Sequence, residues 1–228
     1  YLLQENLMTT MTVRDLYEQM VGFATSDMSL NEFTVADFTK FLRNFVGTQD
    51  VKVKTARDIC VEMDQVIILG SYNPEDDEEN LPAITISVTF NPEQRMIRIV
   101  DVDWAKICID LIERVGHEVI HQHQFRNRNF DISPFMFASK TPNLDKLEVQ
   151  EYLANPDEIE AYGYSIAIEM YLKHSGLVLT SKHVGQCQVF KVYCDAFGTN
   201  HIIVKQLLEF AVKYFKHLNG EEIYVKEV

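Results

Sequence analysis

The stretch DWAKICIDLIERVGHEVIHQHQFRNR, residues 103–128, contains the strongest signal in the sequence, the pentapeptide HEVIH at 117–121. Apolar residues recur in it at helical spacing, and Asp103 at its start has the side chain of a good N-cap. On a helix that turns about 100° per residue, His117 and His121 point about 40° apart, so both imidazoles can reach a single ion. The stretch therefore predicts a helix with a two-histidine metal site.

Glu118 lies between the two histidines, beside the metal-facing stripe of the predicted helix. A carboxylate at this position can hold a metal-activated water without becoming a ligand, which is the reason for the HExxH spacing. The alternative is an amphipathic helix whose two histidines are hydrogen-bonded and bind no metal. We favour the metal site, because by residue frequencies a chance HExxH arises on the order of once in a hundred such chains.

A zinc site of this type needs a third protein ligand. The stretch ANPDEIEAYGYSIAIEMYLKHSG, residues 154–176, predicts a second helix, because Asn155 can cap it, Pro156 suits its first position and a glycine ends it. Glu158 and Glu160 both lie in its first turns. Glu158 could also simply close a capping box, since acidic residues are favoured at a helix start. The residues alone leave the third ligand open.

HEVIH followed by a second helix with EIEA resembles the gluzincins, zinc metallopeptidases with HExxH on one helix and a glutamate ligand in an ExxA-like context on a later helix. The pattern is also similar to small HExxH proteins that tailed phages encode and that are usually described as metallopeptidases. The resemblance covers roughly residues 81–175. It implies a zincin-like fold, bound zinc and hydrolysis of peptide bonds.

The resemblance also assigns roles to individual residues. It makes Glu158 the third ligand, because Ala161 matches the alanine of ExxA, with Glu160 as the second choice. Tyr162 occupies the position that supports a histidine in many gluzincins, where Asp or Asn is usual, and a phenol can make such a hydrogen bond. We place Tyr162 in the catalytic site, with Tyr164 and Tyr152 as further candidates for stabilising an oxyanion.

The rest of the sequence predicts an α+β fold. In residues 51–102 the apolar period shortens to that of strands, and we expect a small antiparallel sheet. NPEQ (91–94) is expected to join its last two strands as a hairpin loop, and PEDDEEN (74–80) to be a solvated acidic loop. An extended connection is expected between the two metal-site helices.

We predict a single zincin-like domain over residues 1–228, in which the sheet packs on the HEVIH helix and further helices lie at both ends. In chain order, its parts are two N-terminal helices (1–50), the sheet (51–102), the metal-site helices (103–176) and two C-terminal helices (177–228).

Composition limits the class of protein. The 228 residues are 46% hydrophobic and 24% charged, enough for one sizeable core. A formal charge of −13 opposes binding to nucleic acid or anionic lipid. No apolar run approaches the ~20 residues that span a bilayer, so we expect a soluble cytoplasmic protein without membrane contact. If a phage encodes it, the expected location is the host cytoplasm or the virion.

These observations predict a zinc metallopeptidase that acts on a peptide or protein. Zinc is held by His117, His121 and Glu158, Glu118 takes the proton, and the strand TISVTF (85–90) offers an edge to an extended substrate. The alternative is a non-catalytic zinc protein with a structural or interaction role, such as a phage particle component or a host-protein binder. We favour the peptidase, because a structural zinc site does not need a glutamate between its histidines.

Overall fold

The computed structural model describes residues 12–26, 32–46, 51–63, 65–98, 104–131, 146–174 and 181–220. The chain divides into two compact units, Tyr1–Gln122 and His123–Val228. Among the described helices, none combines the length and the apolar character needed to cross a bilayer.

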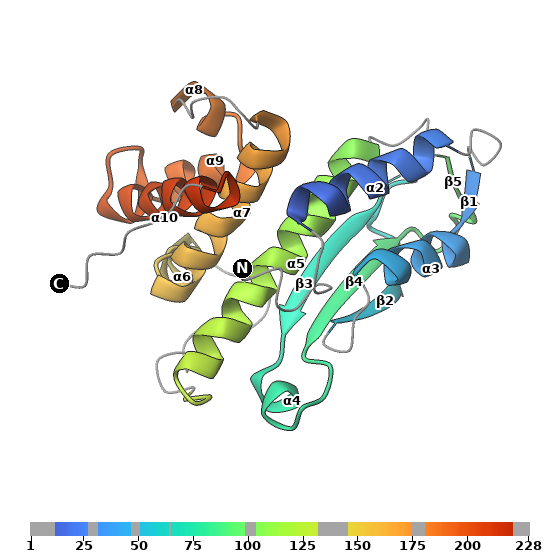
Figure 1. The fold of residues 1–228 in the computed structure, drawn as a ribbon, viewed down its shortest axis with the longest axis horizontal. Coiled ribbons are helices and arrows are strands. Elements are labelled where there is room, and N and C mark those ends of the chain that lie inside the picture. Colours follow the sequence, from blue (N-terminus) through green and yellow to red (C-terminus); the bar gives the residue numbers. More distant parts are fainter. Residues whose placement is uncertain are drawn as a thin grey trace. The chain divides into compact units, whose positions relative to one another are not determined.

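The first unit is mixed α and β, as predicted (Figure 1). The two expected N-terminal helices are present, residues 51–102 contain strands as expected, and an additional short strand precedes the second helix. In chain order the elements are α2 (Val13–Ser26), β1 (Glu32–Thr34), α3 (Val35–Val46), β2 (Val51–Arg57), β3 (Ile67–Tyr72), α4 (Pro74–Glu78), β4 (Ile84–Phe90), β5 (Met96–Arg98) and most of α5 (Trp104–Asn127).

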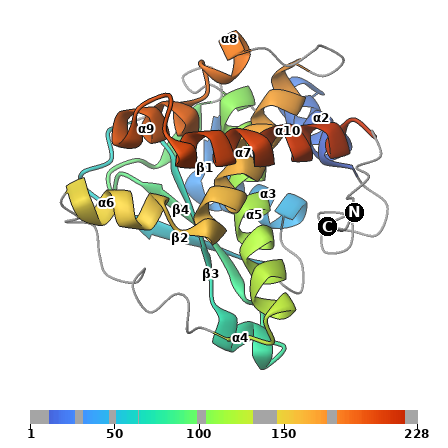
Figure 2. The same ribbon diagram turned by 90° about the vertical axis from the view of Figure 1, so that its left-hand side faces the viewer.

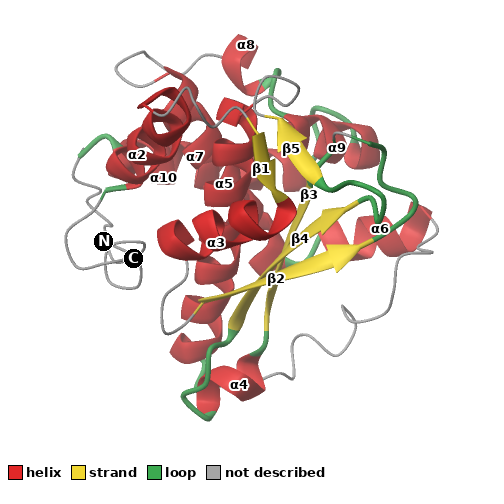
Figure 3. Ribbon diagram, turned by 90° about the vertical axis from the view of Figure 1, so that its right-hand side faces the viewer, coloured by secondary structure: helices red, strands yellow, loops and turns green. Residues whose placement is uncertain are grey.

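The main sheet has three strands in the order β2-β4-β3 (Figure 3). β3 pairs with β4 antiparallel, but β2 pairs with β4 parallel, from Val51↔Ile84 to Arg57↔Phe90. The prediction of an antiparallel sheet is therefore wrong for one of the two pairings. It is also wrong that the strand 85–90 offers an edge, because β4 is the central strand. Period-2 alternation does not depend on strand direction or order, so the sequence pattern could not reveal either.

The predicted hairpin at residues 91–94 does not form. β5 leaves the main sheet and pairs antiparallel with β1 in a separate two-stranded sheet. Asn91 Nδ2 donates to the carbonyl oxygen of Val61 at 2.7 Å, and Arg57 Nη1 donates to the carbonyl oxygens of Asn91 and Gln94 at 3.2 and 3.1 Å. These bonds hold the turn against the end of β2, so the chain does not fold back along β4.

The acidic segment 74–80 is not a simple solvated loop, since its first five residues form the helix α4. Asn73 caps this helix by accepting a hydrogen bond from the Glu75 amide at 3.2 Å, and Pro74 occupies its first position. Asp77 is buried and accepts hydrogen bonds from the Tyr72 hydroxyl (2.9 Å) and from Gln122 Nε2 of α5 (3.0 Å). One acidic side chain therefore ties α4 to α5.

Aromatic packing fixes the start of α5 in the first unit. The buried Phe38 of α3 makes edge contacts with Phe90 of β4 (ring centroids 5.9 Å apart) and with Trp104 of α5 (5.8 Å). The Trp104 indole N–H donates to the carbonyl oxygen of Met20 in α2 at 2.9 Å. Asp103, the expected N-cap, lies outside the described residues.

The second unit is helical (Figure 2). The expected extended connection contains a helix, and the first of the two expected C-terminal helices is divided in two. The elements are α6 (Lys146–Leu153), α7 (Pro156–His174), α8 (Ser181–Val184), α9 (Gln188–Phe197) and α10 (Ile202–Leu218). The central α7 is buried along most of its length, because its apolar residues do not keep to one stripe.

α7 and α10 cross in close contact at Gly163. A Cβ atom built on Gly163 would lie 2.5 Å from Cβ of Phe210, 3.3 Å from the amide nitrogen of Ala211 and 3.3 Å from the carbonyl oxygen of Leu207. Two of these neighbours are backbone atoms, which cannot move without moving α10. The missing side chain of Gly163 is what allows the helices to pack this closely.

We expect Gly163→Ala to destabilise the protein by about 1–3 kcal/mol, the usual cost of overpacking a core, although alanine favours helix over glycine. Urea unfolding followed by circular dichroism measures the change. Gly22→Ala in α2 is the matched control, because a Cβ there meets nothing within 4 Å, and it should leave stability unchanged or raise it. If the Gly163→Ala variant is as stable as the wild type, the close approach of α10 to α7 at Gly163 does not contribute to stability.

Candidate metal centre

α5 brings the two histidines of HEVIH together as the helical spacing predicts. Nε2 of His117 and Nε2 of His121 lie 3.1 Å apart, and the rings meet edge to face at a centroid distance of 4.7 Å. His117 is 4% exposed and His121 is half-buried. The two ring nitrogens therefore converge on one point beside α5.

This arrangement fits a zinc ion. Two histidine nitrogens bound at ~2.0–2.1 Å to a tetrahedral zinc lie about 3.3 Å apart, close to the observed 3.1 Å. Imidazole nitrogens are among the ligands that zinc prefers, and the burial of His117 reduces competition from water. The pair is arranged as metal ligands would be.

Glu118 faces the strand β3 and is 6% exposed. A Cβ atom built on Gly70 of β3 would lie 2.6 Å from Oε1 of Glu118 and 2.9 Å from its Cγ. The carboxylate thus packs directly against the backbone of β3. It does not belong to the group of side chains that could jointly hold an ion, which is the arrangement expected for a proton acceptor.

Glu158 lies in the first turn of α7 and is 9% exposed. Its Oε2 accepts a hydrogen bond from the Tyr152 hydroxyl of α6 at 2.8 Å. Asn155 caps the helix by accepting a hydrogen bond from the Asp157 amide at 3.0 Å. A buried carboxylate costs free energy unless its charge is compensated, so a cation bound beside Glu158 would be favourable.

Glu160, the second choice for the third ligand, is engaged in a different way. Its Oε2 accepts a hydrogen bond from Gln124 Nε2 at 2.9 Å, and its Oε1 accepts one from the Tyr214 hydroxyl of α10 at 2.7 Å. Both carboxylate oxygens of Glu160 therefore already accept a hydrogen bond from an uncharged donor. The two glutamates point about 200° apart on α7, and Glu160 connects α7 to the end of α5 and to α10.

The last turn of α5 is bonded to the first turn of α7. Gln124 Nε2 also donates to the carbonyl oxygen of Asp157 at 3.2 Å, and Arg128 makes an ion pair with the Asp157 carboxylate at 2.7 Å. His121 lies one turn before Gln124 on the same helix. His117, His121 and Glu158 each offer one ligand atom, and these atoms lie within 4.8 Å of one another.

The tyrosines proposed for catalysis differ in position. Tyr162 is half-buried, its hydroxyl lies 3.5 Å from that of Tyr152, and its ring contacts the Tyr193 ring edge-on at 5.8 Å. Tyr164 is 2% exposed and packs against the Tyr214 ring, so it cannot reach a substrate. No sequence pattern indicated that Tyr152 contacts Glu158, because the contact joins two different helices.

Burial raises the pKa of the Tyr152 hydroxyl well above its ordinary value, and the neighbouring Tyr162 and Glu158 raise this pKa further. The hydroxyl therefore stays protonated over the physiological range and donates its hydrogen bond to Glu158 throughout. This bond reaches one of the two carboxylate oxygens, so Tyr152 orients the carboxylate of Glu158.

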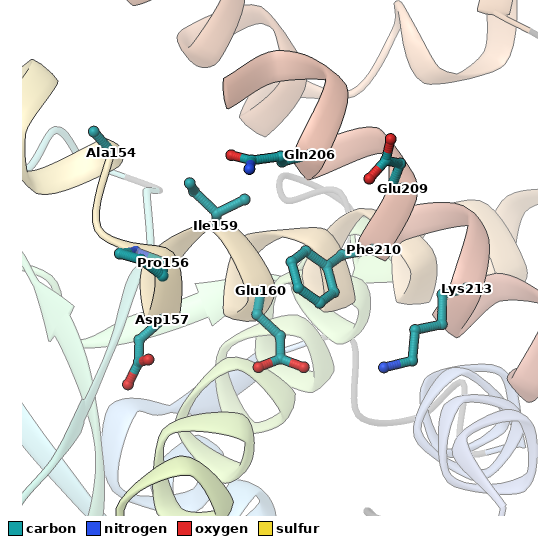
Figure 4. A pocket seen from close by; sticks show the side chains of 9 residues that line it. All are labelled: Ala154, Pro156, Asp157, Ile159, Glu160, Gln206, Glu209, Phe210 and Lys213. Atoms are coloured by element: carbon teal, nitrogen blue, oxygen red, sulfur yellow. The ribbon is translucent and has the colours of Figure 1, made fainter. Parts of the chain in front are cut away.

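A separate cleft of about 550 Å³ lies between α7 and α10 (Figure 4). Asp157 and Glu160 line it but are already bonded to Arg128, Gln124 and Tyr214. The remaining lining mixes apolar, polar and charged residues and comes from both helices and the preceding turn: Ala154, Pro156, Ile159, Gln206, Glu209, Phe210 and Lys213. Glu158 does not line this cleft.

Comparisons of the chain with protein-family models, with curated proteins and with solved structures find no match.

Proposed function

We propose that the chain is a zinc-dependent metallopeptidase of the gluzincin type, with His117, His121 and Glu158 as zinc ligands and Glu118 as the general base. The observation that carries the proposal is the convergence of one ligand atom from each of these three ligands within 4.8 Å. Two histidines and one carboxylate leave a fourth tetrahedral position for a water or a substrate oxygen, which is the composition of a catalytic zinc site.

Zinc bound by this set would lower the pKa of a water molecule and polarise the carbonyl group of the scissile peptide. The residues of the chain supply the remaining chemistry. Glu118 takes a proton from the attacking water and can return it to the leaving amine. Tyr152 holds the Glu158 carboxylate in one orientation through its 2.8 Å hydrogen bond. Burial of His117 and Glu118 strengthens the electrostatic interactions at the site.

The proposed substrate is an extended peptide that adds to the edge of β3. Among the described residues β3 pairs with β4 alone, so its other edge has backbone groups for a further strand. Glu118 packs against this strand at Gly70. Ile67 and Leu69, on the outward row of β3, are 40% and 53% exposed. An extended peptide at this edge would lie beside the base and could place apolar side chains next to Ile67 and Leu69.

A pair of variants tests the ligand set. Glu158→Gln replaces a ligand oxygen by a neutral amide, and we expect it to weaken zinc binding by more than about 100-fold, the upper end of the losses seen for residues that merely support a ligand. Glu160→Gln is the matched control on the same helix. It should change zinc affinity only a few-fold, because both Glu160 oxygens already accept hydrogen bonds from Gln124 and Tyr214.

Zinc affinity is measured by competition with a chromogenic chelator, and circular dichroism checks that both variants are folded. Zinc loss with Glu160→Gln and not with Glu158→Gln would reverse the assignment. If neither variant changes zinc affinity, the site on α5 and α7 is not the zinc site and the proposed function fails.

A further inference from the structure

We infer that Gly70 is a positioning residue for Glu118: the missing side chain at this point of β3 leaves the space in which the general base lies. The inference rests on the proposed function and adds a residue to its catalytic arrangement. No sequence motif marks Gly70, which lies 48 positions before Glu118 in the chain.

The space at Gly70 is filled by Glu118 itself. A Cβ atom at position 70 would lie 2.6, 2.9 and 3.1 Å from Oε1, Cγ and Cδ of Glu118, and real Cβ atoms do not approach other atoms as closely as the first two distances. Among the described glycines, positive φ angles occur at Gly198 and Gly220 but not at Gly70. Glycine in a strand interior weakens the strand, so clearance for Glu118 is the physical reason for a glycine here.

The neighbouring positions make this space a notch. Side chains alternate along a strand, so Ile68, Gly70 and Tyr72 share the face of β3 that Glu118 contacts. Ile68 is buried, and the Tyr72 hydroxyl donates to Asp77 at 2.9 Å. A glycine between two large residues therefore leaves room for one side chain from α5.

Hydrogen bonds near the end of β3 also hold α5 against this strand. Asp77 also accepts a hydrogen bond from Gln122 Nε2 at 3.0 Å, and Gln122 lies one turn after Glu118 on α5. The hydrogen bonds from Tyr72 to Asp77 and from Gln122 to Asp77 thus connect the end of β3 to the helix that carries the base. A side chain at position 70 would displace the end of the Glu118 side chain more easily than it would displace the helix. The histidines lie on the adjacent stripe of α5 and would stay in position with the helix.

Gly70→Ala tests the inference. We expect it to keep zinc affinity and KM and to lower kcat by roughly 10- to 100-fold, since misplacing a reacting group by about 1 Å costs about that much. Combined with Glu118→Gln, it should cause no further loss, because the base is already absent. Gly22→Ala is the matched control and should leave kcat unchanged, since a Cβ there meets nothing within 4 Å.

Two results would overturn the inference: wild-type kcat in Gly70→Ala, or an equal loss of kcat in the wild-type and Glu118→Gln backgrounds. The second result would mean that the added methyl group disturbs substrate binding along β3 and not the base.

Thermal stability provides a readout that does not need activity. Gly70→Ala should raise Tm more in a Glu118→Ala background, where the notch is empty, than in the wild type, where Glu118 must move. Equal shifts in both backgrounds would overturn the inference. A wild-type protein that cleaves no peptide would instead count against the proposed function, and the Tm comparison would still decide whether Gly70 positions Glu118.

Discussion

Glu118→Gln is expected to lower hydrolysis by about 10²–10⁴-fold, the usual contribution of a general base, while zinc content and Tm stay near the wild-type values. Glutamine has the shape of glutamate, so it fits the same space against Gly70. It cannot take a proton from water. Because Glu118 is outside the group of possible ligands, its replacement removes the base and leaves the metal site intact.

The measurement combines a peptide-cleavage screen on the wild type with zinc analysis and thermal melts of both proteins. A library of extended peptides with apolar residues at alternate positions is the first choice of substrates, because of Ile67 and Leu69 on β3. If the wild type cleaves nothing in a broad screen of peptides and proteins, the enzyme hypothesis fails. A non-catalytic zinc protein would then be the better description, and Glu118→Gln should not affect its biological role.

His117→Ala and His121→Ala are each expected to abolish binding of the one zinc ion that the wild type should carry. A zinc site with two remaining ligands binds far more weakly, and a bound metal stabilises the folded state by about 2.7 kcal/mol at a free concentration 100 times Kd. We therefore expect a lower Tm for both variants. A chelator such as EDTA should lower the Tm of the wild type but not that of either variant.

Zinc is counted by elemental analysis of the 228-residue chain after dialysis. His201→Ala is the matched control, because His201 is an exposed residue that caps α10 by accepting a hydrogen bond from the Ile203 amide at 3.3 Å. It should keep one zinc per chain. A wild-type protein that is fully folded and free of metal in the presence of excess zinc would rule out the metal centre and, with it, the peptidase.

The sequence by itself determined the local geometry of this protein. Spacing at i and i+4 on a helix brings two side chains to one face whatever surrounds them, so HEVIH predicted that His117 and His121 lie side by side, and their Nε2 atoms lie 3.1 Å apart. The same periodicity predicted α2, α3 and α5, and the Asn155–Pro156 start predicted α7. The short helix α4, which we expected to be a loop, has the same kind of start at Asn73–Pro74. The sequence therefore contained a signal for this helix as well.

Only the tertiary structure decided what depends on partners distant in the chain. The parallel pairing of β2 with β4 and the departure of β5 to β1 could not be predicted, because alternation is the same in every arrangement of strands. Glu158 and Glu160 are equivalent as a local pattern at a helix start. Tyr152 contacts one, and Gln124 and Tyr214 contact the other, and these contacts separate their roles. Gly70 likewise acquires a role only where β3 meets Glu118, because steric clearance depends on packing and not on spacing along the chain.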